Sequence, residues 1–346
     1  MESAENARTL AGAPQGVVRT AAIASLATHV PPRVLTNADL EKMVETSDEW
    51  IVQRTGIRER HIVDNDVATS DLAAVAALQA IERAGLTPAD IDFIVVGTTT
   101  PDTIFPSTAC LVQHRIGAKR AWGFDLGAAC SGFTYALTTA ATMVATGASR
   151  HALVIGADVM SSIIDYTDRT TCVLFGDGAG AVVVSPARED GLGIIDFAHE
   201  IDGSGGPALC MPAGGSRLPA SHETIDRRLH YVKQDGPSVF RFAVRKTEEI
   251  FRRLLDRNHL TTADISLFVS HQANRRIIES AADKLGLPDE KVVVNIDKYG
   301  NTTGATIPLA LDDAVKARRL KKGDLVLLAS VGAGFTVGSV LLRWTC

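Results

Sequence analysis

The decapeptide Leu86-Thr-Pro-Ala-Asp-Ile-Asp-Phe-Ile-Val95 recurs as Leu260-Thr-Thr-Ala-Asp-Ile-Ser-Leu-Phe-Val269, and six of the ten positions are identical. A segment with apolar residues at helical spacing precedes each copy, over 72–84 and 242–255. A second helical segment follows each copy and ends in a leucine or isoleucine before a glycine, which is typical of a helix C-terminus. Because the agreement in order extends beyond the ten residues, it predicts an internal repeat rather than a chance similarity.

Strands and helices alternate within each copy. The repeated segment is followed by a strand at 122–126 or 292–296, then by a turn and a new helix, and then by the apolar run 151–155 or 325–328. Such runs are typical of strands that are buried on both faces of a sheet. The sequence therefore predicts an α/β fold with two mostly parallel sheets, covered by helices and related by pseudo-twofold symmetry.

Composition limits the functions that the chain can have. The 346 residues are 46% hydrophobic and 22% charged, which indicates an ordered globular protein. The formal charge is −5 and no long basic block is present, so nucleic acid is not an expected partner. No apolar stretch approaches the roughly 18 residues of a membrane span, and the N-terminus does not resemble a secretory signal. We expect no membrane association and a cytoplasmic location.

Five cysteines occur at wide spacing: Cys110, Cys130, Cys172, Cys210 and Cys346. Their odd number and the lack of a C-x-x-C pair favour neither a disulfide framework nor a metal site. Cys130 differs from the others because a strand gives way to a helix through small residues around it. The positive end of a helix dipole would lower the pKa of this thiol and make it a nucleophile. Its alternative role is that of a small buried apolar residue, which we expect for Cys110 and Cys172.

Two further polar residues occupy positions where α/β proteins bind ligands. His271 follows the apolar run 267–270 and precedes a helix, so it lies at the carboxyl end of a strand. Asn301 stands in Tyr299-Gly-Asn-Thr-Thr-Gly-Ala305 as an N-cap would, and capping is its alternative role. The repeat suggests that Cys130 and Asn301 are equivalent ends of the two halves, which would bring them close to the symmetry axis.

Two glycine-rich segments, 175–183 and 331–338, precede apolar runs. Neither fits G-x-G-x-x-G or a P-loop, so nucleotide phosphate binding is not supported. Their structural interpretation is a tight turn into a strand. Their functional interpretation is that backbone N–H groups near Ala333 face developing negative charge.

Six motifs together resemble one known family, the β-ketoacyl-ACP synthase III enzymes that start type II fatty acid synthesis. In order, they are Asp48–Arg60, Asp125–Tyr135, Phe175–Gly180, His271–Asn274, Gly300–Thr302 and Gly332–Phe335. The similarity begins at about residue 19 and runs to the C-terminus. It implies a thiolase-like fold of two pseudo-symmetric halves in five αβαβα layers, and a homodimer. We expect the halves at 19–190 and 191–346, after a loose extension over 1–18.

The resemblance also implies a set of roles. Cys130 would be the acyl-accepting nucleophile, and His271 with Asn301 would drive decarboxylation. The substrates would be acyl-CoA and malonyl-ACP, the carrier protein being a partner, and no cofactor or metal is implied. The remaining roles fall on backbone oxyanion donors at Cys130 and Ala333, on CoA contacts at Trp50, Arg54, Arg169 and Asn274, on carrier-protein contacts at Arg276, Arg241 and Lys284, and on an acyl-pocket residue, Phe105, which favours short primers.

Two positions depart from the family pattern, and three rival functions stay open. Ala333 replaces a glycine and would be strained if its φ were positive, and Gly304 lowers the rigidity expected around Asn301.

Cys130 and His271 are 141 residues apart, a spacing also found in papain-like cysteine hydrolases, although the local C-G-S-C-W signature is absent. A non-catalytic scaffold is disfavoured because all three chemical positions are filled. A related acyltransferase of polyketide-type secondary metabolism would use the same three residues.

Overall fold

A computed structural model describes residues 19–346 and contains two larger sheets built on one plan. The strands of the first sheet, in spatial order, are β1 (Ala21–His29), β7 (Gly178–Pro186), β6 (Ala152–Asp158), β4 (Phe93–Gly97) and β5 (Trp122–Leu126). The strands of the second, in the matching order, are β8 (Gly193–Ile201), β13 (Thr336–Arg343), β12 (Leu325–Gly332) and β11 (Leu267–Ser270). Strand β4 pairs in parallel with both β6 and β5 in the first sheet, and β11 pairs in parallel with β12 in the second. The two pairings at the other end of each sheet are antiparallel.

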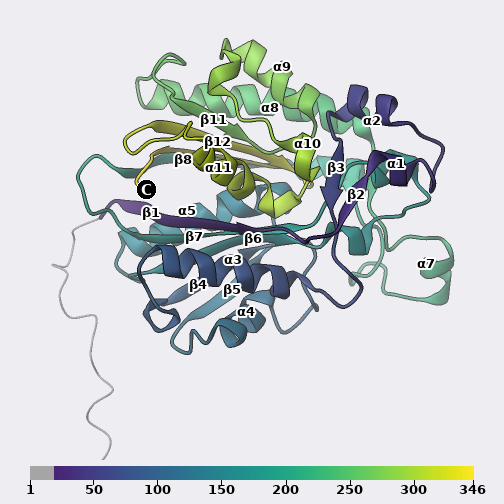
Figure 1. The fold of residues 1–346 in the computed structure, drawn as a ribbon, viewed down its shortest axis with the longest axis horizontal. Helices are drawn as coiled ribbons and strands as arrows, with labels where there is room; N and C mark the ends of the chain where they lie inside the picture. Colours follow the sequence, from purple (N-terminus) through teal and green to yellow (C-terminus); the bar gives the residue numbers. More distant parts are fainter. Residues whose placement is uncertain (1–18) are drawn as a thin grey trace, which may run out of the picture.

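Helices cover both sheets and fill the space between them (Figure 1). Those on the outer faces are α3 (Thr69–Arg83) and α4 (Thr108–Ile116) on the first sheet, and α8 (Gly236–Arg257) and α9 (Arg275–Leu285) on the second. Those in the middle are α5 (Gly132–Ala145) and α11 (Thr306–Lys316), and α5 contacts strands of both sheets. The five αβαβα layers that the resemblance implied are therefore confirmed.

The internal repeat is confirmed at the level of strand register. Phe93 pairs with Ala152 in the first sheet, and Leu267 pairs with Val326 in the second, each residue 174 positions after its counterpart. Helices α5 and α11 also begin 174 residues apart, and α3 and α8 end 174 residues apart. The expected boundary between residues 190 and 191 falls between β7 and β8 and stays a prediction, and the extension over 1–18 lies outside the described residues.

The strand predicted over 292–296 does not form. Over 292–296 the chain makes only an isolated parallel bridge, from Val292 to Phe268, and the short helix α10 (Ile296–Tyr299) begins where the strand was expected to end. The counterpart of β5 is thus reduced to one bridge in the second half. The apolar side chains of this segment satisfied the pattern for a strand because they are buried, not because the backbone extends a sheet.

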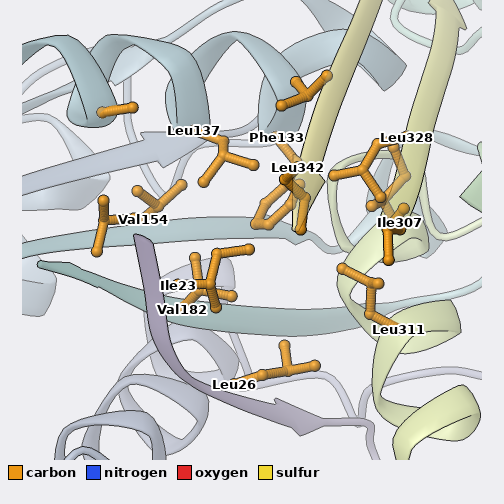
Figure 2. Close-up of a cluster of buried hydrophobic side chains, with 14 of the residues drawn as sticks. Ile23, Leu26, Phe133, Leu137, Val154, Val182, Ile307, Leu311, Leu328 and Leu342 are labelled. Carbon is orange, nitrogen blue, oxygen red and sulfur yellow. The ribbon is translucent and has the colours of Figure 1, made fainter. Parts of the chain in front are cut away.

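The largest apolar cluster lies where the two sheets face the middle helices (Figure 2). Strand β6 is buried along its whole length, as its uninterrupted apolar run predicts. The cluster joins residues from both halves, among them Ile23, Leu137, Val182, Leu311 and Leu342. Each such aliphatic side chain contributes about 1.5–3 kcal/mol when it is removed from water. The halves therefore share one core and pack as one body.

Short elements extend from the sheets at one end of the molecule, where α1, α2, β2, β3 and α7 lie together (Figure 1). Those before α3 are β2 (Val34–Thr36), α1 (Asn37–Leu40), α2 (Asp48–Thr55) and β3 (Glu59–His61). Those between β6 and α8 are α6 (Arg169–Cys172), β9 (Leu209–Cys210), α7 (His222–Asp226) and β10 (Lys233–Gln234). Together with the strand ends, several of these segments form the walls of the main cavity described below.

Glycines let the two halves touch backbone to backbone. A Cβ on Gly156, in β6, would lie 2.0 Å from the carbonyl oxygen of Gly304, and a Cβ on Gly304 would lie 2.7 Å from the carbonyl oxygen of Gly97. No side chain can be accommodated at these distances. Gly304 is therefore a close-packing position that holds the segment after Asn301 against β6, contrary to the expectation that it loosens this region.

We expect Gly156→Ala to lower the free energy of unfolding by about 1–3 kcal/mol or more, because the added methyl group meets backbone that cannot rotate away. Urea denaturation of the purified protein measures the effect. Gly215→Ala is the matched control, since no atom lies within 4 Å of a Cβ at that position. Equal stability of the two variants would contradict the close contact.

Candidate active site

The three residues expected to be catalytic line one cavity of about 480 Å³. Cys130 lies in a 3-10 turn between β5 and α5, His271 follows the last residue of β11, and Asn301 precedes another 3-10 turn, 303–305, that leads into α11. All three side chains are buried. Segments of both halves thus bring a thiol, an imidazole and an amide to the same space. Cys130 and His271 follow strand ends, where α/β sheets bind ligands, whereas Asn301 follows the short helix α10.

The turn that carries Cys130 has an unusual backbone. Ala129 has φ of 46°, in the left-handed region that non-glycine residues seldom adopt, so the turn stores conformational energy just before the thiol. Gly332, at the end of β12, approaches so closely that a Cβ there would lie 2.7 Å from the Cys130 nitrogen. Thr336 donates a hydrogen bond of 2.8 Å to the Ala128 carbonyl and ties the turn to the second sheet.

The expectation of a low pKa for Cys130 is wrong for the free protein. Burial raises the pKa of this thiol to about 12, and the charge of Asp158 acts in the same direction. The backbone N–H of Cys130 and the Thr303 side chain lower the pKa, but by less. Helix dipoles influence a thiol most when water and other charges are far away, whereas desolvation penalises the thiolate wherever the side chain is enclosed. The resting thiol is therefore neutral at physiological pH.

His271 is held as a neutral imidazole. Its backbone N–H donates to the Ala329 carbonyl at 2.7 Å, which continues the β11–β12 ladder by one residue and fixes the ring at the cavity. Burial lowers the pKa of His271 from 6.5 to about 3. The next residue, Gln272, is a structural anchor, because its amide donates to the carbonyls of Ser270 and Val293, both at 3.0 Å.

The buried His271 predicts a dependence of stability on pH. The unfolded chain binds a proton at this residue below about pH 6.5, whereas the folded chain does so only near pH 3. We therefore expect the contribution of His271 to be present above pH 6.5 and lost as the pH falls, by about 1.4 kcal/mol per pH unit. Urea titrations at pH 5 and pH 7 of the wild type and of His271→Gln isolate the contribution. An unchanged pH dependence in the variant would contradict it.

Asn301 does not cap a helix, which corrects the expectation. Helix α11 begins only at Thr306, and the Asn301 Oδ1 atom instead accepts a hydrogen bond of 3.0 Å from the backbone N–H of Thr303. Backbone hydrogen bonds to Leu174 and from Gly176 hold Asn301 from the other side. Because the carbonyl end of the amide is occupied, the Nδ2 group is the end that is free to donate into the cavity.

The repeat pairs Cys130 with Gly304 rather than with Asn301. Ala129 and Thr303 are 174 residues apart and share a left-handed backbone, with φ of 46° and 49°. Each precedes the second residue of a 3-10 turn that leads into a middle helix. Asn301 therefore lies three residues before the true counterpart of the thiol. The two turns still contact each other, which is why both residues reach one cavity.

Asp158 is a buried residue beside the site that the sequence analysis missed. This buried carboxylate accepts hydrogen bonds from Thr98, Thr99 and Thr100 on one oxygen and from the Gly304 N–H, at 2.8 Å, on the other. Burial raises its pKa. It joins the segment after β4 to the turn beside Asn301. A polar residue at the end of a fully apolar strand was the available signal, the same one that selected His271.

A second, apolar pocket of about 130 Å³ begins at Cys130 on the side of Ala333. The remaining residues that line it come mostly from segments far apart in the chain: Thr99, Ala129, Met160, Ile163, Phe175, Leu209, Cys210, Met211, Val232 and Thr303. The strain anticipated at Ala333 does not occur, because the positive φ of this turn falls on Gly334, at 135°. The oxyanion role of the Ala333 backbone stays a prediction.

The residues expected to contact CoA gather at the mouth of the main cavity. Trp50, Arg54 and Asn274 line it, and the Arg169 guanidinium lies 5.0 Å from the centre of the Trp50 ring. Asn274 caps α9 through a bond from the Arg276 N–H at 2.9 Å, and its Nδ2 donates to the Arg54 carbonyl at 3.0 Å. The structure thus shows a positioning role for Asn274, whereas its contact with a ligand stays a prediction.

Of the residues expected to meet the carrier protein, the structure brings two together. Arg241 and Arg276 both line the mouth of the main cavity. Lys284 is eight residues further along α9 than Arg276, about 12 Å away along the helix, and is paired with Glu248 at 3.4 Å. Phe105 is 84% exposed and lines no described cavity of its own chain. Its expected place in an acyl pocket stays a prediction that requires a second copy.

The other cysteines are distributed differently from our expectation. Cys172 is buried as predicted, but Cys110 is exposed on α4.

Within residues 19–346, no group of three His, Cys, Asp or Glu side chains is arranged to hold a metal ion. None of the helices in that range is both long and apolar enough to cross a bilayer.

The chain is similar to known proteins over most of its length. Family models described as 3-oxoacyl-[acyl-carrier-protein (ACP)] synthase III and its C-terminal part match residues 124–203 and 255–344. Beta-ketoacyl-[acyl-carrier-protein] synthase III of Solibacter usitatus is 60% identical over 94% of this chain and 98% of that protein. The Koribacter versatilis protein of the same name is 57% identical over 94% and 98%.

Solved structures agree with the sequence comparisons. The crystal structure of 3-oxoacyl-[acyl-carrier-protein] synthase III from Aquifex aeolicus is 44% identical, with a TM-score of 0.86, and covers 94% of this chain and all of that one. The priming beta-ketosynthase of the R1128 polyketide pathway is 35% identical, with a TM-score of 0.88 over 96% and 99% of the two chains.

Proposed function

The chain belongs to the β-ketoacyl-ACP synthase III family, and we propose that it condenses a short acyl group from acyl-CoA with malonyl-ACP, as the first step of fatty acid synthesis. One observation carries the proposal. A thiol, a neutral imidazole and a free amide line the same cavity, with an apolar pocket adjoining the thiol.

The first half of the proposed reaction is acyl transfer to Cys130. The sulfur attacks the thioester carbonyl of acyl-CoA, the C–S bond to CoA breaks, and CoA leaves as a thiol that carries the proton lost by Cys130. The negative oxygen of the tetrahedral intermediate would accept hydrogen bonds from the backbone N–H groups of Cys130 and Ala333. The acyl chain would lie in the apolar pocket that begins at Cys130, whose small volume supports short primers.

The second half is decarboxylation of malonyl-ACP. The bond to the carboxylate breaks, carbon dioxide leaves, and the electron pair forms an enolate whose oxygen needs hydrogen-bond donors. Asn301 Nδ2 and an N–H of His271 supply them, and neither group is charged, because burial keeps the imidazole neutral. The enolate carbon then attacks the acyl-cysteine, and the Cys130 sulfur leaves as a thiolate that takes up one proton from water.

Charged and aromatic side chains at the mouth of the main cavity support the proposed binding of CoA and of the acyl carrier protein. Trp50 offers an indole face, and Arg169, which rests on that face in the free protein, would turn aside or stack again on an adenine. Arg54, Arg241 and Arg276 provide positive charge for the phosphates of CoA and for an acidic carrier protein. This local charge contrasts with the overall charge of −5. Lys284 would contribute only at the edge of the contact.

A homodimer is part of the proposal. β5 is an edge strand, paired only with β4, and its first residue, Trp122, is 52% exposed. Ile104 and Phe105 are 86% and 84% exposed. An unpaired strand edge with large apolar side chains favours association with another chain. Sedimentation analysis of the wild type and of Phe105→Asp tests it, and a monomeric wild type would contradict it.

We place the enzyme in the cytoplasm and propose that it needs no cofactor, since thioester carbonyls and a malonyl carboxylate react through the side chains already named.

The proposed condensation is tested by intact-protein mass spectrometry after addition of acetyl-CoA, followed by malonyl-ACP. We expect one acetyl group on the protein, which disappears as acetoacetyl-ACP forms. An adduct that malonyl-ACP leaves unchanged would indicate another acceptor, as in polyketide-type enzymes, and rapid release of free acetate would indicate a hydrolase.

A further inference from the structure

A third and smaller cavity is lined by His271 but not by Cys130 or Asn301. Its volume is about 20 Å³, and most of its lining is aliphatic, from α8, α9, β12 and the residues near His271. Three polar residues also line it: Thr247, Ser270 and His271. These side chains are only 5–6% exposed. None of the residues that line this cavity is acidic or basic apart from His271 itself.

Two polar atoms at this place have no hydrogen-bond partner among residues 19–346. They are the Ser270 Oγ and the His271 Nδ1, both fully enclosed. The other ring nitrogen, Nε2, is not among the enclosed unpartnered atoms and has no hydrogen bond to the described part of the chain, so it is the nitrogen that reaches open space. His271 lines both the main cavity and the small one. We assign the accessible Nε2 to the main cavity and the enclosed Nδ1 to the side of the small cavity, which Ser270 also lines.

Neighbouring residues cannot satisfy these two atoms without rearrangement. Gln272, the nearest amide along the chain, is already occupied by the carbonyls of Ser270 and Val293 and by the N–H of Asn295. Buried polar groups are almost always hydrogen-bonded, either to protein or to ordered water. A water molecule needs roughly 10–15 Å³ of such volume and two to four polar partners. The small cavity meets both conditions.

We propose that one ordered water molecule occupies this cavity and bridges Ser270 to His271 Nδ1, which makes Ser270 a positioning residue for the imidazole. The Ser270 hydroxyl donates to the water, the water donates to Nδ1, and Thr247 offers a third partner. Because Nδ1 then accepts, the single proton of the neutral ring is on Nε2, where it points into the main cavity. The importance of this tautomer for the reaction rests on the proposed role of His271 as a donor to the enolate.

The consequence is a division between the two half-reactions. Acyl transfer to Cys130 does not require a proton on Nε2, whereas the enolate oxygen does. Loss of the Ser270 hydroxyl should therefore weaken condensation about tenfold, the scale of one hydrogen bond, and leave acylation nearly unchanged. A purely structural defect would slow both steps or lower stability instead.

The experiment compares the wild type with Ser270→Ala and with the matched control Ser339→Ala. Ser339 is also a buried serine of the second sheet, but its hydroxyl donates to the Leu328 carbonyl at 2.7 Å and takes no part in the cavity. A high-resolution crystal structure locates the water, ¹⁵N NMR of labelled histidine reports which ring nitrogen carries the proton, and mass spectrometry measures acylation and condensation separately.

We expect a water between Ser270 and Nδ1 in the wild type, an Nε2–H tautomer, and loss or mixing of that tautomer in Ser270→Ala only. Addition of Thr247→Val should deepen the same effect. A cavity without water density, an Nδ1–H tautomer in the wild type, or equal behaviour of Ser270→Ala and the control would overturn the proposal. The structure and the NMR signal do not depend on turnover, so a failure of the proposed condensation would be distinguished from a failure of this inference.

Discussion

Cys130→Ala is expected to take up no acetyl group from acetyl-CoA and to lose at least about a thousandfold in condensation rate, because the thiol that forms the acyl-enzyme is removed. Cys130→Ser should be almost as inactive, since a hydroxyl is a weaker nucleophile than a thiol and is enclosed by the same burial. Intact-protein mass after incubation with acetyl-CoA gives a direct count of acyl groups.

The other cysteines provide the control for this experiment. Cys110 is exposed on α4, so Cys110→Ala should acylate and condense as the wild type does. An acetyl adduct that persists in Cys130→Ala would place the nucleophile elsewhere and would refute the mechanism. The same samples can be treated with iodoacetamide at neutral pH. Because burial raises the pKa of Cys130 to about 12, alkylation of this thiol in the free protein should be slow and should accelerate as the pH rises.

Asn301→Asp is expected to lower the condensation rate by roughly a thousandfold while Cys130 still accepts an acetyl group. The carboxylate could keep the bond from the Thr303 N–H, so the turn should survive. It would, however, place a negative charge near the developing enolate. At about 4 Å and an effective dielectric constant of 20, two like charges repel by about 4 kcal/mol, which corresponds to roughly a thousandfold in rate.

Asn301→Ala separates the charge from the lost donor. Without the amide, the enolate loses one hydrogen bond and condensation should fall by about a hundredfold. The order wild type, Asn301→Ala, Asn301→Asp in decreasing condensation rate, with acylation preserved throughout, supports the proposed role. Similar losses in both half-reactions would instead indicate that Asn301 only holds the turn in place. Thermal unfolding of each variant shows whether the fold is intact.

Much of the architecture could be predicted from the sequence because strands and helix ends leave local patterns in it. Uninterrupted apolar runs mark β4, β6, β11 and β12, and glycines at helix ends mark the boundaries of α4 and α9. The recurrence of one decapeptide at a separation of 174 residues predicted the duplicated plan that the strand register confirms. The failure at 292–296 has a physical cause, since burial alone makes a segment apolar whether or not it pairs with a strand.

Position along the chain also selected the candidate site. Cys130 and His271 stand where strands end, and Asn301 stands just before a turn that leads into a helix. They were chosen for their positions along the chain and for their motifs. Asp158 satisfies the first criterion but carries no recognisable motif, so it was passed over. Its importance is evident only from its partners, which come from the segment after β4 and from Gly304 in the other half.

By itself, the sequence determined the α/β class, the repeat and the identity of three chemically competent residues, because each depends on residue type and on spacing along the chain. Tertiary structure alone decided the rest: the neutral thiol of Cys130, the neutral ring of His271, the free end of the Asn301 amide and the two cavities that His271 lines. These properties depend on desolvation and on hydrogen-bond partners far away in the sequence. Packing of the two halves creates both, and no local pattern records them.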